Sequence, residues 1–330
     1  MITVEMLNDV KHVIVHDRCP DGMASAIILL DAFRGRLTAQ DVTFLEHETE
    51  CYEKHAADPG TLFCDITPPP RRAQEFVDAG VLVLDHHEPE KVTPYGARGV
   101  HGSEPGVSGA VLAFREVWVP LQVPFRETVP SDHVQYREFA METFATLAGI
   151  RDTWQKDDPR FRQASAQAAA LMFWPRAAWL EDVISKGAHR ANSERLDLGE
   201  TLLEKVEEDA RRFIAEQESF ISSRGRVVNI VATKMTSEPA EMLTRAFALT
   251  PRPAHAPDVL IGFRYFVDHG VRMIELSCRS VSDVPVRPFC QRFGGGGHLR
   301  AAGVSLSVSV RDGNPYEMIR ALWNRWEETT

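Results

Sequence analysis

Asp85-His86-His87 is the part of this sequence with the clearest capacity for chemistry. It directly follows the apolar run 81–84, which predicts a buried strand of a parallel sheet. An acid and two imidazoles at the end of such a strand would lie at the carboxyl edge of the sheet, where open α/β sheets bind ligands. Imidazole and carboxylate groups together suit Mn, Zn or Fe. The alternative is a surface turn that happens to carry two histidines.

Acids and imidazoles also follow three other apolar segments. Each acid alone is typical of a helix cap or a turn. A parallel sheet would bring several of them to one edge, where the carboxylates would repel each other without a cation. Two metal ions about 3.5–4 Å apart, with one carboxylate between them, would remove that repulsion. The segments and their polar residues are 13–15 with His16, Asp17, Cys19 and Asp21; 62–64 with Asp65; and 144–150, interpreted as a further strand, with Asp152.

A second group of residues near the carboxyl terminus suits the binding of an anion. Four glycines, 294–297, precede His298 and Arg300. Consecutive glycines expose backbone N–H groups and let the main chain approach a ligand closely. The small residues 301–303 suit the start of a helix, where the dipole favours an anion. A flexible hinge is the alternative, but apolar sequence on both sides argues against it.

Taken in order along the chain, these motifs resemble those of the DHH phosphoesterase superfamily. The resemblance covers nearly the whole chain. It implies a bilobal α/β protein, with an N-terminal parallel-sheet DHH domain and a smaller C-terminal mixed-sheet DHHA1 domain. The segments that resemble the DHH motifs are 16–22, Asp65, Asp85-His86-His87 and Asp152, and those that resemble the DHHA1 signature are 294–298 and 301–303.

The resemblance also implies a role for each residue and two bound ions, usually Mn²⁺, with Mg²⁺ or Co²⁺ as substitutes. Asp65 would bridge the ions. His87 would face the substrate phosphate and stabilise its developing charge, and Asp85 would orient its neighbours. Asp21, His86 and Asp152 would complete the ligands of one ion, and His16 would bind the other. The substrate would contact a separate set of residues: Arg279, Gly295, Gly296, Gly297, His298 and Arg300. Ser108 could contact phosphate, although a helix N-cap is favoured.

Cys19 departs from the family pattern, which has an aspartate at this position. Three explanations are open. Cys19 could bind metal as a thiolate, which would favour softer ions such as Zn or Fe. Asp17 could replace the missing ligand. Alternatively, the first metal site is weak and fills only with substrate. We favour this third explanation because a buried free cysteine is more often a small apolar residue than a ligand.

Composition is compatible with this interpretation. The 330 residues are enough for two domains, and 44% hydrophobic and 25% charged residues are ordinary for a globular protein. A formal charge of −10 disfavours long duplex nucleic acid as a partner. The five cysteines form no CxxC pair, and neither a signal peptide nor a membrane-length apolar run is evident. We therefore expect a cytoplasmic protein with no membrane partner, and a homodimer is compatible with the sequence.

Strand-like segments alternate with helical patterns in the first half of the chain, as in a parallel sheet. We predict domains at 1–192 and 225–330, joined by a helical connector at 193–224. The segment 117–130, rich in proline, predicts an irregular loop, and the charged segment 193–222 has a helical period. Predicted strands are 12–15, 42–46, 61–64, 81–84, 226–232, 259–263 and 273–278; predicted helices are 22–30 and 316–326. His47, His55, His101 and His189 follow no spacing typical of metal ligands.

By resemblance, the substrate is a short phosphorylated molecule: an oligonucleotide, a dinucleotide or polyphosphate. We favour hydrolysis of short oligonucleotides or dinucleotides to mononucleotides. One alternative is an exopolyphosphatase-like phosphoanhydride hydrolase. Another, motivated by Cys19, is a catalytically weakened nucleotide-binding protein. A dinucleotide-cofactor enzyme fits the predicted sheet, but the first turn lacks the GxGxxG pattern that such a cofactor requires.

Overall fold

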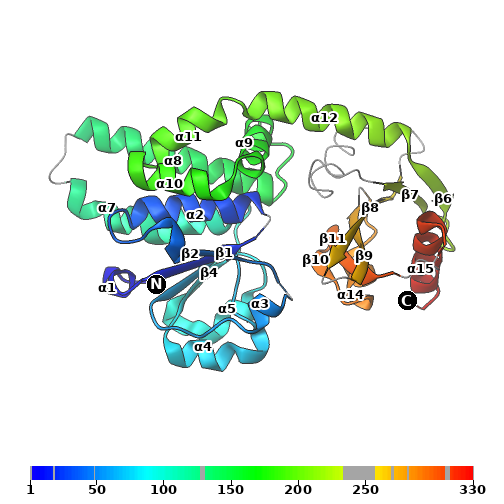
Figure 1. Ribbon diagram of the computed structural model, residues 1–330, viewed down its shortest axis with the longest axis horizontal. Coiled ribbons are helices and arrows are strands. Elements are labelled where there is room, and N and C mark those ends of the chain that lie inside the picture. The colour runs from blue at the N-terminus through cyan, green and yellow to red at the C-terminus, as the bar shows by residue number, and fades with distance from the viewer. Residues whose placement is uncertain are drawn as a thin grey trace. The chain divides into compact units, whose positions relative to one another are not determined.

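The computed structural model (Figure 1) describes residues 2–17, 19–47, 49–126, 131–232, 257–268, 271–280, 282–308 and 313–329. The chain divides into two compact units, Met1–Leu203 and Glu204–Thr330. The division falls within α12 (Gly199–Ala215), inside the predicted connector. Each unit contains its own sheet, parallel in the first and mixed in the second. The predicted α/β class with two different sheets is therefore confirmed.

The first unit is built on a parallel five-stranded sheet in the order β2-β1-β3-β4-β5. Side chains alternate between its two faces, and both faces are apolar. Ile14, Phe63 and Val83 belong to the core on one side, whereas Val15 and Leu84 belong to the core on the other. The strands are β1 (His12–His16), β2 (Val42–Leu45), β3 (Thr61–Cys64), β4 (Leu82–Asp85) and β5 (Gly99–His101).

Helices cover both faces of this sheet (Figure 1). The face carrying Val15 and Leu84 packs against α2 (Pro20–Ala32), which begins directly after the first polar motif as predicted. With α2 lie α6 (Gly109–Ala113), a π-helical turn η4 (Phe114–Trp118), α7 (Val119–Arg126), α8 (Ser131–Asp152), α9 (Phe161–Phe173), α10 (Arg176–Lys186) and α11 (Ala188–Leu196). The remaining helices are α1 (Val4–Asn8), α3 (Glu50–Glu53), α4 (Ala73–Ala79) and α5 (Pro89–Val92), with 3-10 turns η1 (Ala39–Asp41), η2 (Pro70–Arg72) and η3 (Thr93–Arg98).

Two sequence predictions in this unit were wrong. Segment 144–150 is not a strand but the last part of α8. It is apolar throughout because it is buried on two sides: Phe144 and Ala148 belong to the main core, and Leu147 and Ile150 to a separate cluster. The described part of segment 117–130 is helical rather than irregular, and 127–130 lie outside the described residues.

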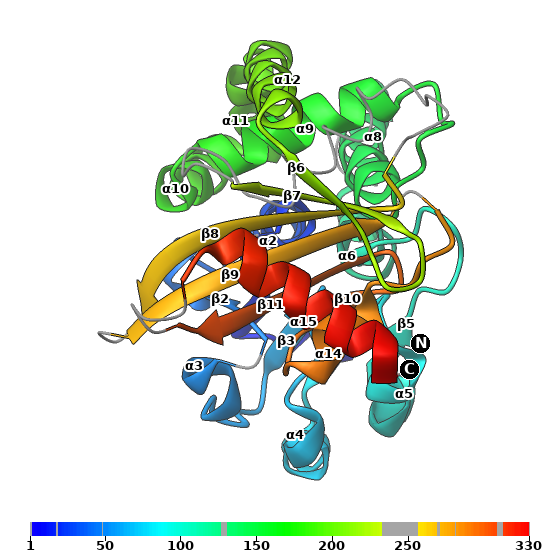
Figure 2. The same ribbon diagram turned by 90° about the vertical axis from the view of Figure 1, so that its right-hand side faces the viewer.

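The second unit contains a mixed six-stranded sheet in the order β10-β11-β9-β8-β7-β6. One face carries apolar residues such as Leu276 and Val304, which pack against Phe289, Trp323 and Trp326. Figure 2 shows α15, which carries both tryptophans, lying across this sheet. The elements are β6 (Glu218–Ile221), β7 (Val227–Ala232), β8 (Val259–Asp268), β9 (Val271–Ser280), α14 (Arg287–Arg292), β10 (Gly296–His298), β11 (Ala301–Ser307) and α15 (Pro315–Thr329).

Two predictions in the second unit need correction. The helical pattern assigned to 193–222 ends with α12, and 218–221 form the edge strand β6. Residues 301–303 do not start a helix: they begin β11, which pairs antiparallel with β10. A Cβ on Gly295 would lie 2.1 Å from the carbonyl oxygen of Gly303. This glycine is therefore required for close packing against β11, a reason that its sequence context did not indicate.

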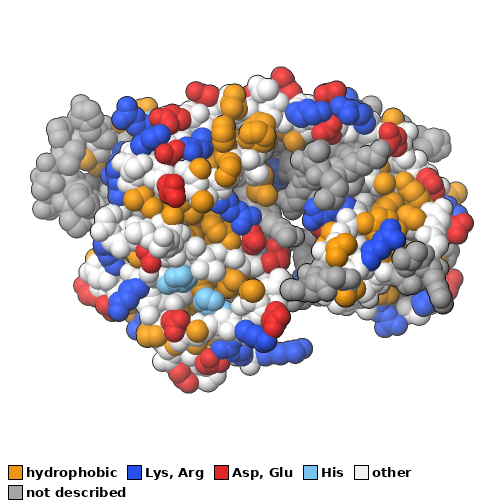
Figure 3. Space-filling view, in the orientation of Figure 1, with side chains coloured by type: hydrophobic (Ala, Val, Ile, Leu, Met, Phe, Trp, Pro, Cys, Tyr) orange, Lys and Arg blue, Asp and Glu red, His pale blue; other side chains and the backbone are white. Residues whose placement is uncertain are grey.

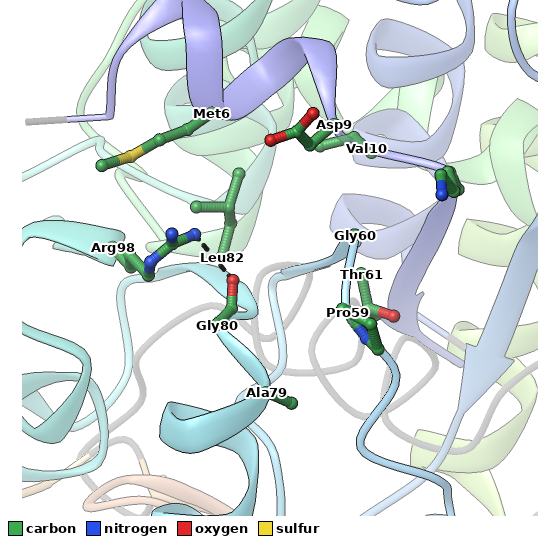
Figure 4. Close-up of a pocket in the computed structure, with 11 residues that line it drawn as sticks. Met6, Asp9, Val10, Pro59, Gly60, Thr61, Ala79, Gly80, Leu82 and Arg98 are labelled. Carbon is green, nitrogen blue, oxygen red and sulfur yellow. Dashed lines mark hydrogen bonds between the residues drawn. The ribbon is translucent and has the colours of Figure 1, made fainter.

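Figure 4 shows a pocket at the amino-terminal ends of the parallel strands, near Gly60, Thr61 and Leu82. Its volume is about 260 Å³, and Lys11 also lines it. Arg98 also lines it and donates a hydrogen bond to the carbonyl oxygen of Gly80. The polar residues that follow β1, β3 and β4 lie at the opposite, carboxyl edge. Within the described residues, no helix is both long and apolar enough to cross a membrane.

Asp31 joins the helices that cover the main core. It is 2% exposed and accepts hydrogen bonds from Trp118 Nε1 at 2.8 Å and Arg137 Nη2 at 2.6 Å. Its second oxygen accepts from the backbone N–H of Ala188 at 3.0 Å. One carboxylate therefore ties α2 to η4, α8 and α11. Because α2 also carries Asp21, this network helps to position the polar edge.

We expect Asp31→Ala to lower the free energy of unfolding of the first unit by about 2–6 kcal/mol, since it leaves two buried N–H groups, at about 1–3 kcal/mol each, and the half-exposed Arg137 without their acceptor. Urea unfolding followed by far-UV circular dichroism measures the change. Asp78→Ala, at an exposed residue of α4, is the matched control and should stay within about 0.5 kcal/mol of wild type. Equal stabilities for the two variants would contradict this role of Asp31.

Candidate metal centre

The carboxyl ends of the parallel strands bring most of the predicted ligands together. Three groups of side chains each place their ligand atoms within 4.8 Å of one another. Asp65, at the end of β3, belongs to two groups, and His86, after β4, also belongs to two. The groups are Asp21, His86 and Asp152; His16, Cys19 and Asp65; and Asp65, Asp85, His86 and His87.

His86 lies at the centre of the first group. Its Nε2 is 3.2 Å from Asp65 Oδ1 and 3.3 Å from Asp152 Oδ2. Asp21, in the first turn of α2, is 1% exposed and accepts a 2.6 Å hydrogen bond from the hydroxyl of Ser108. Ser108 does stand at the N-cap position of α6, but its hydroxyl makes no capping bond. The favoured N-cap position is therefore confirmed, although the hydroxyl donates to the buried carboxylate and not to the helix backbone.

The second group leaves polar atoms without partners. His16 Nδ1 lies 3.8 Å from Asp65 Oδ2. Both atoms are buried and have no hydrogen-bond partner in the described structure, and the same holds for Asp152 Oδ2. Buried polar groups are ordinarily paired. An imidazole nitrogen and carboxylate oxygens without protein partners are therefore suited to hold a divalent cation.

The carboxylates of this centre destabilise each other's charge. Burial, and next the charge of Asp21, hold the pKa of Asp65 well above its usual range. Burial and the charge of Asp152 likewise raise the pKa of Asp21. A bound cation would reverse this effect because an opposite charge nearby favours the ionised carboxylate. Chemistry and burial of the donors thus both fit a metal centre.

Asp85 and His87 form a separate ion pair beside these carboxylates. His87 Nδ1 lies 2.6 Å from Asp85 Oδ1, which also accepts from the backbone N–H groups of His86 and His87. Burial opposes both charges, but this hydrogen bond holds the pKa of Asp85 well below its usual range. The same bond and the charge of Asp85 raise the pKa of His87 to about 9. In the metal-free protein, His87 is therefore a cation at neutral pH.

Backbone geometry brings α6 close to Asp65. Asp65 has φ of 63°, in the left-handed region, which costs about 1–3 kcal/mol for a residue other than glycine. Gly109 faces it: a Cβ there would lie 2.4 Å from Asp65 Cβ and 2.9 Å from Asp21 Oδ2. Only glycine allows this approach. The sequence offered no signal for Gly109, because the close contact depends on tertiary structure.

Cys19 lies among the candidate metal ligands, whereas Asp17 does not. Cys19 lies with His16 and Asp65 in the second group. Burial and the charge of Asp65 raise the pKa of its thiol well above the usual range, so that it is neutral in the metal-free chain. Asp17 instead forms an ion pair with Arg176 of α10 and belongs to none of the three groups in the described structure.

The predicted substrate residues lie in the second unit. Backbone pairing places His298 opposite Ala301, and Ala301 opposite Arg279 of β9, in one row across three strands. Arg279 is half-buried and donates to the carbonyl oxygen of Cys278, while the side chain of His298 lies outside the described residues. Arg300 is exposed and pairs with Asp283 at 2.5 Å. Gly296 and Gly297 lie in β10, directly after Gly295.

Glu46 and His47 also belong to the centre, although no role was predicted for them. Glu46 Oε1 lies 3.5 Å from His16 Nε2. The ring of His47 is 5.2 Å from that of His16 and 6.5 Å from that of His87. Burial and the charge of His16 lower the pKa of His47 to about 3, so it is neutral. Both residues directly follow strand β2, just as His16 is the last residue of β1. Their position at a strand end was therefore a signal in the sequence, but the spacing typical of metal ligands does not include it.

No protein-family model matches the sequence, and no curated protein matches it. Solved structures do match. A DHH domain, described as a member of a family of ribosomal proteins, is 11% identical, covers 97% of this chain and 87% of its own, and gives a TM-score of 0.56. Exonuclease RecJ bound to manganese is 17% identical, with 98% and 91% covered and a TM-score of 0.51.

The chain has the fold of DHH-domain proteins. A pGpG-specific phosphodiesterase from Vibrio cholerae also matches, at 12% identity over 97% of this chain and 100% of its own, with a lower TM-score of 0.43. At these identities the likeness is one of fold. It agrees with the parallel sheet of the first unit and the separate mixed sheet of the second.

We expect Gly109→Ala to disturb the centre directly, because the added methyl group must displace Asp65 or Asp21. Overpacking of this kind costs about 1–3 kcal/mol. Urea unfolding and Mn²⁺ titration calorimetry of the same sample measure both effects. Gly296→Ala, where a Cβ meets nothing within 4 Å, is the control for stability. Wild-type Mn²⁺ binding by Gly109→Ala would contradict the close approach.

The Asp85–His87 pair should make the stability of the metal-free protein depend on pH. The folded pKa of His87, about 9, exceeds the unfolded value of about 6.5. The contribution of protonated His87 to the free energy of unfolding is therefore complete below about pH 6.5 and is lost as the pH rises through 9. The depressed pKa of Asp85 gives a contribution that is present above about pH 3.9 and is lost on acidification. Urea unfolding of EDTA-treated wild type and His87→Asn between pH 5.5 and 9.5 tests this, and a pH-independent difference would contradict it.

Proposed function

We propose that this chain is a metal-dependent phosphoesterase that hydrolyses phosphodiester bonds of short oligonucleotides or dinucleotides to mononucleotides. The observation that carries the proposal is the shared position of Asp65. It belongs to two ligand groups at the carboxyl edge of the sheet, and its second oxygen is buried with no hydrogen-bond partner in the part of the chain that the structure describes. One carboxylate between two cations is the arrangement of two-metal hydrolases.

Residues of this chain would hold two ions. Asp21, His86 and Asp152 would complete one ion beside Asp65, and His16 the other. Two divalent cations, when bound, polarise phosphoryl oxygens and lower the pKa of the attacking water. Mixed imidazole and carboxylate donors suit Mn²⁺, and the similar exonuclease structure contains manganese. We therefore propose Mn²⁺ as the ion, with Mg²⁺ or Co²⁺ as substitutes.

The chain's own groups would act on the phosphate as well. His87 carries a positive charge at neutral pH and is held in place by Asp85. As a cationic donor it can stabilise negative charge that develops on a phosphoryl oxygen. In the second unit, Arg279 and His298 would bind a phosphate across the small residue Ala301, with Arg300 and the glycines of β10 nearby in the chain.

Charge favours a short substrate. The chain has a formal charge of −10, and binding of long nucleic acid needs an extended basic surface. On the face shown in Figure 3, lysines and arginines are interspersed with acids. A substrate bound at one cationic, metal-bearing centre needs no such surface. We therefore propose a dinucleotide or short oligonucleotide rather than long DNA.

The proposal predicts Mn²⁺-dependent release of mononucleotide from a 5′-labelled dinucleotide. Chelation should abolish turnover, and His87→Ala should lower it by about 10²–10³-fold, as loss of one donor to a developing oxyanion does. His189→Ala, a histidine of α11 outside the centre, should keep wild-type turnover. Phosphate release from polyphosphate without dinucleotide cleavage would select a phosphoanhydride hydrolase. Tight nucleotide binding without turnover in Mn²⁺, Co²⁺, Mg²⁺ or Zn²⁺ would select a binding protein.

A further inference from the structure

The two nitrogens of His16 face two different carboxylates. Nδ1 lies 3.8 Å from Asp65 Oδ2, and both atoms are buried without hydrogen-bond partners in the described structure. Nε2, on the other side of the ring, lies 3.5 Å from Glu46 Oε1. Glu46 directly follows β2, the strand that pairs with β1 and its terminal His16. The ring therefore lies between a buried oxygen without a partner and a half-exposed carboxylate.

This arrangement determines which nitrogen of His16 can bind metal. A neutral imidazole has one N–H donor and one nitrogen with a free lone pair. Glu46 accepts hydrogen bonds only, so it favours the form with the proton on Nε2. Asp65 Oδ2 is also an acceptor, so this form is favoured when a cation lies between Nδ1 and Asp65, where Nδ1 would offer its lone pair to the ion. Histidine ligands commonly donate their other N–H to a carboxylate, which fixes the ring and makes it a better ligand.

The two groups of candidate ligands differ in their number of carboxylates. The group of Asp21, His86 and Asp152 contains two carboxylates besides Asp65, whereas the group of His16, Cys19 and Asp65 contains only the shared Asp65. Glu46 is the carboxylate that contacts His16 from the side opposite Asp65.

We propose that Glu46 is a positioning residue for the ion beside His16: it holds the His16 proton on Nε2, leaves Nδ1 free for metal, and adds a second carboxylate beside a group whose only carboxylate is Asp65. This inference rests on the proposed metal centre and adds a residue to it. His47 supports the same geometry because its ring packs against that of His16 at 5.2 Å and against that of Tyr52 at 5.3 Å. The end of β2 thus holds the His16 ring through two consecutive residues.

Mn²⁺ binding to the full chain, measured by titration calorimetry and by electron paramagnetic resonance of free Mn²⁺, tests the proposal without requiring turnover. Glu46→Ala should weaken one of two Mn²⁺ sites by about 10–100-fold, the usual effect of removing such a partner, and leave the other unchanged. Glu46→Gln should lose less, because its amide oxygen still accepts a hydrogen bond. Glu50→Gln, on the exposed surface of α3 where Glu50 pairs with Lys54, is the matched control and should bind as wild type.

A second pair of variants, made in the Cys19→Asp protein, tests whether the negative charge of Glu46 matters for Mn²⁺ binding. In Cys19→Asp, the added carboxylate should make the site less dependent on Glu46, so Glu46→Ala should weaken Mn²⁺ binding less there than in wild type. Circular dichroism confirms that each variant is folded. Unchanged binding at both sites in Glu46→Ala would overturn the role of Glu46 and leave the metal centre intact. Absence of Mn²⁺ binding to wild type would refute the metal centre itself, and this inference with it.

Discussion

Burial of several carboxylates at one edge of a parallel sheet is the constraint on which this structure depends. Asp21 and Asp65 are each 1% exposed, and Asp152 is close enough to oppose ionisation of both. Such a group is stable only if its members are protonated, or if a cation neutralises them. Among the described residues, neither Asp65 Oδ2 nor Asp152 Oδ2 has a hydrogen-bond partner, which favours the cation. In this account, part of the folding free energy of the first unit is coupled to metal binding.

The surrounding elements serve to maintain that arrangement. The parallel strands place His16, Asp65 and His86 at neighbouring strand ends. Helix α2 supplies Asp21, and its position depends on the buried contacts of Asp31 with three other elements. The hydroxyl of Ser108 and the absence of a side chain at Gly109 let α6 pack directly on the two carboxylates.

Sequence patterns were sufficient for the strand ends and insufficient for contacts between distant segments. Asp65 and Asp85-His86-His87 could be located because each follows a short apolar strand. Segment 144–150 was misinterpreted because a helix buried on two sides is as uniformly apolar as a buried strand. Gly109 and Glu46 could not be assigned from spacing alone, because their importance lies in what they approach: Asp65 for one and the second nitrogen of His16 for the other.

The central claim is a proposal: Asp65 would lie between two metal ions. Diffraction from wild-type crystals grown with Mn²⁺, recorded at the manganese absorption edge, locates the ions directly. The account predicts two anomalous peaks about 3.5–4 Å apart, with Asp65 contacting both, His16 contacting one, and Asp21, His86 and Asp152 contacting the other. A single peak away from Asp65, or no peak at the carboxyl edge of the sheet, would contradict it.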